Sequence, residues 1–187
     1  MIIVLVGESA SGKTTLAKKF EEETDFSRVI TYTTRPMREG ERNGIDYHFI
    51  SDEQFDEMGE KGQFIEHAEY RGWKYGTAMD SLIGGNKIVV LTPAGARAMK
   101  RNWDKIFHRV TRQNKIIYIK VDRRSRLTKM LERGDDIEES YRRSLSDVGQ
   151  FDAFEYEADF TVHNDCYKKS VDEVFQEIKK IIENEVA

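Results

Sequence analysis

Cysteine and proline are both scarce in this sequence. Its 187 residues include one cysteine, Cys166, and two prolines. A lone cysteine excludes an intrachain disulfide and indicates a reducing compartment. No proline-rich linker, internal repeat or low-complexity tract divides the chain. We therefore expect one domain of moderate size, or one core with small inserted lobes.

Long hydrophobic runs and basic arms are missing as well. No apolar run approaches the roughly 20 residues that span a bilayer, and Met1–Val6 lacks the basic flank and the length of a signal peptide. The net charge is −4, and no long basic arm indicates a nucleic-acid partner. The four histidines show no metal-ligand spacing, which predicts no structural zinc. We expect a cytoplasmic protein without nucleic-acid or membrane partners.

The hydrophobic residues that are present, 39% of the chain, follow two spacings. Continuous apolar runs predict strands buried on both faces, and apolar residues at helical spacing predict helices between them. The predicted strands are Ile2–Val6, Lys87–Leu91, Lys115–Val121 and Asp159–Val162, and the predicted helices are Lys13–Glu23, Ala94–Arg101, Ser125–Arg133 and Lys169–Glu185. This alternation predicts an α/β fold with a parallel sheet flanked by helices.

Two segments interrupt that alternation. Residues 31–85 are rich in glycine and contain short aromatic stretches that predict strands at Asp46–Ile50, Phe64–Tyr70 and Trp73–Thr77. We expect them to form an inserted, mostly antiparallel lobe. Residues 134–150 are polar and densely charged, which predicts a small helical lid. The core then consists of residues 1–30, 86–133 and 151–187.

A phosphate-binding loop is the strongest motif. Gly7-Glu-Ser-Ala-Ser-Gly-Lys-Thr14 matches G-x-x-x-x-G-K-[ST] between a predicted strand and a predicted helix. Its glycines let backbone N–H groups converge on a phosphate, and the helix N-terminus adds positive potential. Lys13 is placed to reach the β and γ phosphates, and the Thr14 hydroxyl is a ligand for Mg²⁺. We predict ATP and Mg²⁺ as ligands of Gly7, Ser9, Ala10, Ser11, Gly12, Lys13, Thr14 and Thr15.

The inserted lobe carries candidate residues for the phosphate acceptor. Arg35 and Arg38 lie three apart around Pro36, so both guanidinium groups can bind one phosphate from an extended segment. Tyr47 follows a glycine turn and is a further donor. Glu66 and Thr77 lie in the same lobe, and a carboxylate there can accept from guanine N1–H and the exocyclic amine. These residue types predict a nucleotide acceptor.

Residues 33–49 resemble the guanylate kinase signature T-T-R-x-x-R-x-x-E-x-x-G-x-D-Y-x-F, followed by F-I-E at 64–66 and Y-G-T at 75–77. The resemblance extends from Ile2 to about Lys180 and implies transfer of a phosphoryl group from ATP to GMP. It also implies a P-loop fold with a five-stranded parallel sheet. It places Arg35, Arg38, Tyr47 and Tyr75 at the GMP phosphate, Thr31, Glu66 and Thr77 at the base, and Glu41 behind the arginines. It also implies that Lys13, Arg38, Arg133 and Arg143 act in catalysis, and that Asn164 lies near the ATP base.

The sequence departs from that family at several positions. Thr92 occupies the place of an aspartate that helps to read guanine, which removes a hydrogen-bond acceptor. Lys129 and Ser144 stand where the family has lid arginines, although Arg142 and Arg143 are adjacent to Ser144. Glu8, inside the phosphate loop, is unfavourable near ATP phosphates unless it points to solvent.

Alternatives to a GMP kinase stay open at this point. The acceptor can instead be dGMP, another nucleotide or a phosphorylated sugar. A non-catalytic module that binds phosphopeptides is also compatible with the lobe, although an intact phosphate loop opposes it. Either a monomer or a homodimer is compatible with the sequence.

Overall fold

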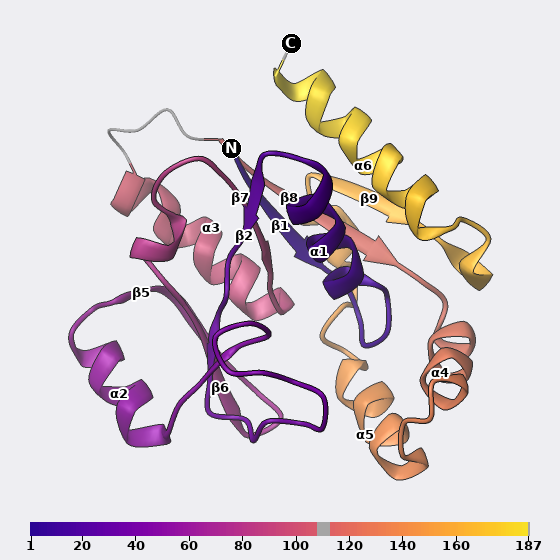
Figure 1. The fold of residues 1–187 in the computed structure, drawn as a ribbon, viewed down its shortest axis with the longest axis horizontal. Helices are drawn as coiled ribbons and strands as arrows, with labels where there is room; N and C mark the ends of the chain where they lie inside the picture. The colour runs from indigo at the N-terminus through magenta and orange to yellow at the C-terminus, as the bar shows by residue number, and fades with distance from the viewer. Residues whose placement is uncertain (108–112, 187) are drawn as a thin grey trace.

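The computed structural model describes residues 1–107 and 113–186, excluding the side chains of 104–107 and 186. Its central sheet has five strands in the order β2-β7-β1-β8-β9, and every neighbouring pair is parallel. The strands are β1 (Ile2–Val6), β2 (Phe26–Arg28), β7 (Asn86–Val90), β8 (Asn114–Lys120) and β9 (Phe160–His163). The predicted five-stranded parallel sheet is confirmed (Figure 1).

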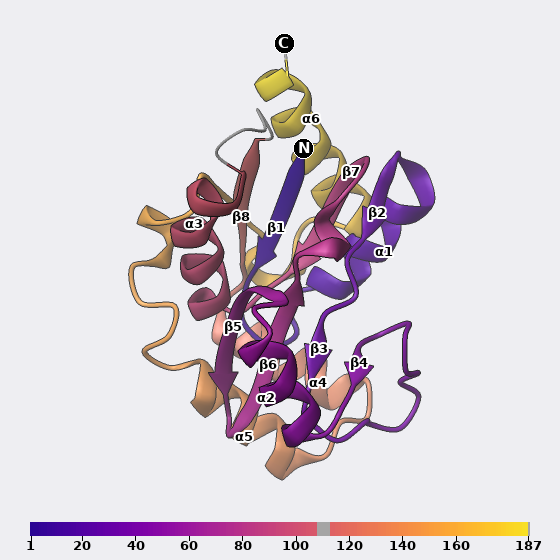
Figure 2. The same cartoon turned by 90° about the vertical axis from the view of Figure 1, so that its left-hand side faces the viewer.

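Helices cover both faces of this sheet because its strands are buried on both. Along β1, Ile3 and Leu5 pack with α1 (Lys13–Glu23) and α6 (Val171–Val186), while Ile2, Val4 and Val6 pack with α3 (Pro93–Phe107). Figure 2 shows α3 on one side of the sheet and α1 on the other. The alternation of side chains along each strand therefore supplies two separate cores.

A second sheet has the strand order β4-β3-β6-β5. Its strands are β3 (Tyr32–Thr33), β4 (His48–Phe49), β5 (Phe64–Tyr70) and β6 (Trp73–Ala78). The pair β3–β4 is parallel and the other two pairs are antiparallel, which confirms a mostly antiparallel second sheet. It packs through β5 against α3.

Two helices follow β8, and their N-termini are capped by aspartates. Helix α4 (Arg123–Glu132) begins after Asp122, and α5 (Ile137–Asp147) begins after Asp136; each cap side chain accepts a backbone N–H from the first turn. In Figure 1 these helices and the second sheet both extend to the side of the central sheet opposite the two termini. The phosphate loop, which follows the carboxyl end of β1, lies on that side.

Sequence patterns missed some of the short elements. Strand β2 has three residues, of which only Phe26 is buried, so it shows no hydrophobic period. Helix α2 (Asp52–Glu60) was also missed, although Ser51 and Gln54 form a capping box that the sequence displays. The predicted strand at 46–50 is only two residues long, His48–Phe49, and α3 begins before and ends beyond the predicted Ala94–Arg101.

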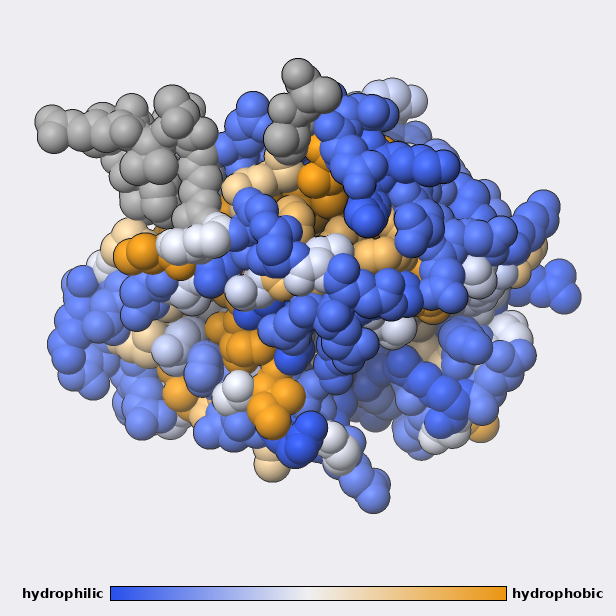
Figure 3. Space-filling view, turned by 45° about the horizontal axis from the view of Figure 1, so that its top comes forward, coloured by the Kyte–Doolittle hydropathy of each residue, from blue (hydrophilic) through white to orange (hydrophobic). Residues whose placement is uncertain are grey.

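The molecular surface is largely polar, as expected from 34% charged residues. On the face shown in Figure 3, hydrophilic side chains predominate and hydrophobic ones form small separate patches. Within residues 1–107 and 113–186, no helix has both the length and the apolar character that a membrane crossing requires. Short 3₁₀ turns at Asp80–Leu82, Phe154–Tyr156 and Asp165–Tyr167 complete the described elements.

Candidate active site

The phosphate loop between β1 and α1 contains backbone conformations and close contacts that favour glycine. Gly12 has a φ of +93°, and Ala10 has a φ of 65° in the left-handed region. At Gly7 a Cβ atom would lie 2.6 Å from the backbone oxygen of Ile119 and from Ser11 Oγ. Position 7 therefore requires glycine so that the loop can pass close to β8.

Lys13 lies inside this loop. Its Nζ donates to the carbonyl oxygen of Glu8 at 2.7 Å and to Ser11 Oγ at 3.2 Å. Burial lowers the pKa of Lys13 from 10.5 to about 8, while the charges of Asp147 and Glu8 partly oppose that shift. A buried ammonium group with only neutral acceptors is suited to receive an anion.

Glu8 does not point to solvent, so its charge near the phosphate loop must be compensated within the protein. Its side chain is only 12% exposed, and Oε1 accepts a hydrogen bond from Tyr118 OH at 3.0 Å. Arg126 Nη2 lies 3.8 Å from the same oxygen. The carboxylate is thus bound by Tyr118 and compensated by a buried arginine.

Asp147, at the end of α5, joins three parts of the structure. Its carboxylate accepts from the backbone N–H of Ser9 at 2.9 Å, from Tyr70 OH at 3.0 Å and from Arg126 Nη1 at 3.0 Å. These donors belong to the phosphate loop, the second sheet and α4. No motif marks Asp147, Tyr70 or Arg126, and 138 residues separate Ser9 from Asp147, so sequence reasoning had no signal for this contact.

One cavity of about 260 Å³ brings phosphate-loop and acceptor residues together. Among the predicted site residues it is lined by Gly7, Ser9, Ala10, Lys13, Thr14, Thr31, Arg35, Arg38, Tyr47, Glu66, Tyr75, Thr92, Arg133 and Arg143. A second cavity of about 520 Å³ shares part of the loop and adds Ser11, Gly12, Thr15 and Asn164. Of the predicted residues, only Glu41 and Thr77 line neither cavity, and each bonds to a residue that does.

The arginine pair of the second sheet is held by Glu41. Arg35 donates through Nη2 to both carboxylate oxygens of Glu41, at 2.8 and 3.0 Å, and its guanidinium lies over the ring of Tyr47 at 5.4 Å. Glu41 also accepts from the backbone N–H of Arg38 at 2.8 Å. Burial raises the pKa of Glu41, but these donors more than offset it and leave the pKa lowered. The side chain of Arg38 extends toward the lid.

Glu66 lines the 260 Å³ cavity with a buried carboxylate. It is 3% exposed, and Oε1 accepts from Thr77 Oγ1 at 2.5 Å. Burial raises the pKa of Glu66 from 4.5 to about 7, against the hydrogen bonds from Thr77. A Cβ at Gly95 would lie 2.8 Å from Glu66 Oε2, so glycine leaves room for the carboxylate. Thr92 Oγ1 accepts from Gly95 N at 3.1 Å and thus caps the start of α3.

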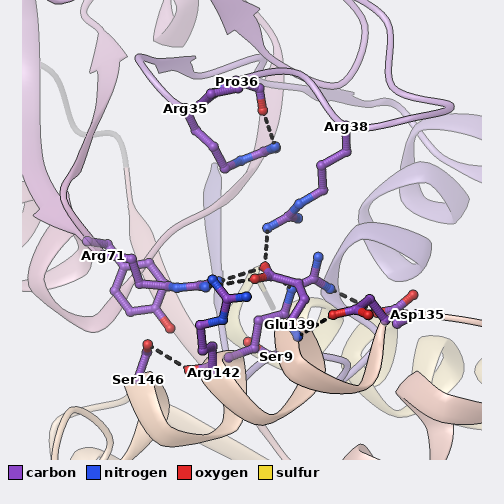
Figure 4. Close-up of polar contacts among 12 residues, drawn as sticks. Ser9, Arg35, Pro36, Arg38, Arg71, Asp135, Glu139, Arg142 and Ser146 are labelled. Atoms are coloured by element: carbon purple, nitrogen blue, oxygen red, sulfur yellow. Dashed lines mark hydrogen bonds and ion pairs between the residues drawn. The ribbon is translucent and has the colours of Figure 1, made fainter.

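Two further arginines that line the 260 Å³ cavity, Arg133 and Arg143, are paired with acidic residues close to them in the chain. Arg143 donates to Asp135 and to Glu139, both at 3.0 Å, and Arg133 donates to Asp135 at 2.8 Å. Arg143 lines the 260 Å³ cavity, whereas Arg142 is exposed. Ser144 is buried and accepts from Arg123 Nε at 2.8 Å. Figure 4 shows this charged cluster, including Arg71, which sequence reasoning missed.

Asn164 shapes the loop beside the second cavity. Its Nδ2 donates to the carbonyl of Lys169 at 3.0 Å, and its Oδ1 accepts from Lys169 N at 2.8 Å. Tyr167, in the same loop, donates its hydroxyl to the carbonyl of Ala10 at 2.8 Å. Tyr167 therefore connects the loop after β9 to the phosphate loop. Both amide atoms of the Asn164 side chain bond to the backbone of Lys169 within the loop after β9.

A phosphate loop at the carboxyl end of a parallel sheet, sharing one cavity with several arginines, is the arrangement of a P-loop phosphotransferase. The family model described as guanylate kinase matches residues 1–185. The chain belongs to the guanylate kinase family and is a kinase.

Individual relatives agree with that assignment. The guanylate kinase of Chlorobaculum tepidum is 32% identical over 97% of this chain and 93% of its own length. That of Enterococcus faecalis is 48% identical over a shorter stretch, 42% of this chain and 40% of the relative. The crystal structure of guanylate kinase from Anaplasma phagocytophilum superposes with a TM-score of 0.70 at 25% identity, covering 99% of this chain and 85% of that one.

Proposed function

We propose that this chain transfers the γ-phosphoryl group of ATP to GMP, giving ADP and GDP. The observation that carries the proposal is the single cavity in which Lys13 of the phosphate loop and Arg38 of the second sheet both lie. Phosphoryl transfer needs the donor and acceptor oxygens in line on either side of phosphorus, and one shared cavity supports that arrangement. The buried Glu66 supports guanine as the base. The membership of the guanylate kinase family disfavours a phosphopeptide-binding module.

The proposed roles follow the two cavities. ATP occupies the larger one, with its phosphates on the phosphate loop and its base toward Asn164. GMP occupies the smaller one, with its phosphate at Arg35, Arg38, Tyr47 and Tyr75 and its base toward Thr31, Glu66, Thr77 and Thr92. Lys13, Arg38, Arg133 and Arg143 stabilise the charge that spreads over the transferring group. No covalent enzyme intermediate is required.

Magnesium fits the phosphate loop through one hydroxyl. Thr14 is exposed at the start of α1 and lines both cavities, so it is accessible from the two places proposed for the nucleotides. A hydroxyl oxygen is a suitable ligand for this hard cation, which usually takes its remaining ligands from phosphates and water. When bound, Mg²⁺ would neutralise negative charge on the β- and γ-phosphate oxygens of ATP. Within the described part of the chain, no group of three or more His, Cys, Asp or Glu residues is placed to hold a metal by itself.

We divide the chain by role into a core (1–30, 86–133 and 151–187), an acceptor lobe (31–85) and a lid (134–150). Closing the lid over both nucleotides would exclude water, which otherwise hydrolyses ATP. The lone cysteine supports a reducing, cytoplasmic location, where the enzyme works as a monomer or homodimer.

A panel of acceptors tests the proposed function. Each acceptor is supplied with ATP and Mg²⁺, and ADP release is followed. The acceptors are GMP, dGMP, AMP, UMP, CMP and ribose 5-phosphate. GMP is expected to give the highest kcat/KM. A higher value for a phosphorylated sugar or a pyrimidine nucleotide would move the assignment to another acceptor.

Glu66→Gln is expected to lower the ratio of kcat/KM for GMP over AMP by about 10²-fold or more, since it replaces one acceptor oxygen with a donor opposite the donors of guanine. Binding of the phosphate should change less. Thr92→Asp is expected to raise the same ratio, because it adds a carboxylate at the same end of the cavity. If neither substitution changes the ratio, these residues do not read the base.

The affinity for GMP is expected to depend on pH through Glu66. With a pKa of about 7, Glu66 carries a proton below neutral pH, and its O–H then faces the donors of guanine. The dissociation constant for GMP should therefore rise about tenfold between pH 8 and pH 6, from the change in ionised fraction. Calorimetry with wild type and Glu66→Gln checks this. The phosphate of GMP titrates in both proteins, so only the difference between them reports on Glu66, and identical pH profiles would contradict the prediction.

A further inference from the structure

Three arginines from separate segments converge on one carboxylate of the lid. Glu139 accepts from Arg71 Nη1 and Nη2, both at 3.1 Å, and from Arg143 Nε at 3.0 Å. Arg38 Nη2 lies 3.7 Å from the same carboxylate. Figure 4 shows Arg38 and Arg71 pointing toward Glu139 from different sides. A point toward which guanidinium groups converge is a place where a phosphoryl group can be bound.

Arg71 has a backbone conformation that is unfavourable for arginine. It lies with Gly72 in the two-residue turn between β5 and β6, where Tyr70 pairs with Trp73. Both turn residues have positive φ, 59° for Arg71 and 78° for Gly72. Turns of this kind favour Asn, Asp or Gly, and other residues there are strained. The Arg71 side chain is only 11% exposed and lines the 260 Å³ cavity. The residue is therefore turned into the site rather than into solvent.

The hairpin tip also lies close to the ATP side of the cavity. Tyr70, next to Arg71, donates to Asp147 Oδ1 at 3.0 Å, and the same carboxylate accepts the backbone N–H of Ser9 at 2.9 Å. One carboxylate thus connects the residue before Arg71 to the phosphate loop. Arg71 thus lines the cavity next to a residue linked to the phosphate loop, and it shares the carboxylate of Glu139 with Arg38.

We propose that Arg71 is a catalytic residue that binds the transferring phosphoryl group together with Arg38 and Arg143. This rests on the proposed function. During transfer, the bond from Pγ to the β–γ bridging oxygen breaks and its electron pair leaves with ADP, while a phosphate oxygen of GMP forms the new bond to Pγ. Arg71 donates hydrogen bonds to the equatorial oxygens, and no proton moves through it. Glu139 holds the guanidinium groups together by charge before the phosphates enter.

Arg71→Asn is the decisive variant because asparagine tolerates the turn conformation. We expect its kcat to fall about 10²-fold, as for other lost donors to transition-state charge. KM for ATP should change little, and Arg71→Lys should recover part of kcat, since it keeps the charge but not the fork. The matched control is Arg97→Asn on α3, because Arg97 does not line the cavity. This change removes a bidentate pair with Glu157 and a cation–π contact with Phe154. That control should keep kcat within about twofold.

A second measurement separates contact with the phosphoryl group from anchoring of the lid. ADP with aluminium fluoride and GMP mimics the group in transfer, so Arg71→Asn should weaken binding of this mixture about 10²-fold without weakening ADP alone. Glu139→Ala should reduce kcat at least tenfold less than Arg71→Asn does. If Glu139→Ala matches Arg71→Asn and the double variant is no slower, Arg71 only anchors the lid and the inference is overturned. A wild type without activity on GMP would instead refute the proposed function.

Discussion

Lys13→Met is expected to lower kcat by at least about 10³-fold while GMP still binds. Lys13 is the one predicted catalytic cation inside the phosphate loop, and its ammonium group is held there by the Glu8 carbonyl and Ser11 Oγ. Loss of a charge aimed at the transferring phosphoryl removes stabilisation that water cannot replace in a closed site. Arg35 and Arg38 are held by Glu41 and not by Lys13, so GMP binding should be unaffected. Steady-state ADP release measures kcat, and calorimetry measures GMP affinity.

A matched substitution controls for loss of a lysine. Lys61→Met removes a lysine that pairs with Glu57 on the surface of α2, where both side chains are more than half exposed. Turnover of that variant should equal the wild type. If Lys13→Met retains turnover within about tenfold, which corresponds to about 1.4 kcal/mol, the assignment of the phosphate loop to ATP is wrong.

Asp147→Ala is expected to destabilise the fold by about 3–5 kcal/mol, since it leaves a buried charge without its partner. Arg126 and Asp147 are each only 5% exposed and pair at 3.0 Å. The same change removes the acceptor for Ser9 N and for Tyr70 OH, so the phosphate loop should also lose its fixed position and kcat should fall. Urea unfolding gives the free energy, and ADP release gives the rate.

Two further variants set the scale for that result. Glu57→Ala breaks the exposed pair with Lys61 and should cost less than about 1 kcal/mol. Replacing Arg126 and Asp147 together by leucine should recover part of the lost stability, because the buried arginine is removed together with its partner, while Glu8 keeps the hydrogen bond from Tyr118. A loss below about 1 kcal/mol for Asp147→Ala would mean that Arg126 finds another acceptor, such as Glu8.

The phosphate loop was predictable from the sequence because its chemistry is local. Consecutive residues from Gly7 to Thr14 provide the backbone turns, the lysine and the hydroxyl, and the flanking strand and helix show their own periods. The central sheet followed from strands that are buried on both faces and so appear as unbroken apolar runs. The acceptor residues Arg35, Arg38 and Glu41 likewise lie within one short segment.

Tertiary structure alone decided which partners the charged side chains of the site have. The sequence left open how the charge of Glu8 is accommodated, and the fold accommodates it because Tyr118 and Arg126, more than 100 residues away, are brought beside it. Asp147 and Arg71 belong to no motif, and they act on the site only because α5 and the β5–β6 turn meet there. A sequence pattern reports neighbours along the chain. The partners of a buried charge are set by distance in space, and the energy of such a pair depends on that distance and on its exclusion from water.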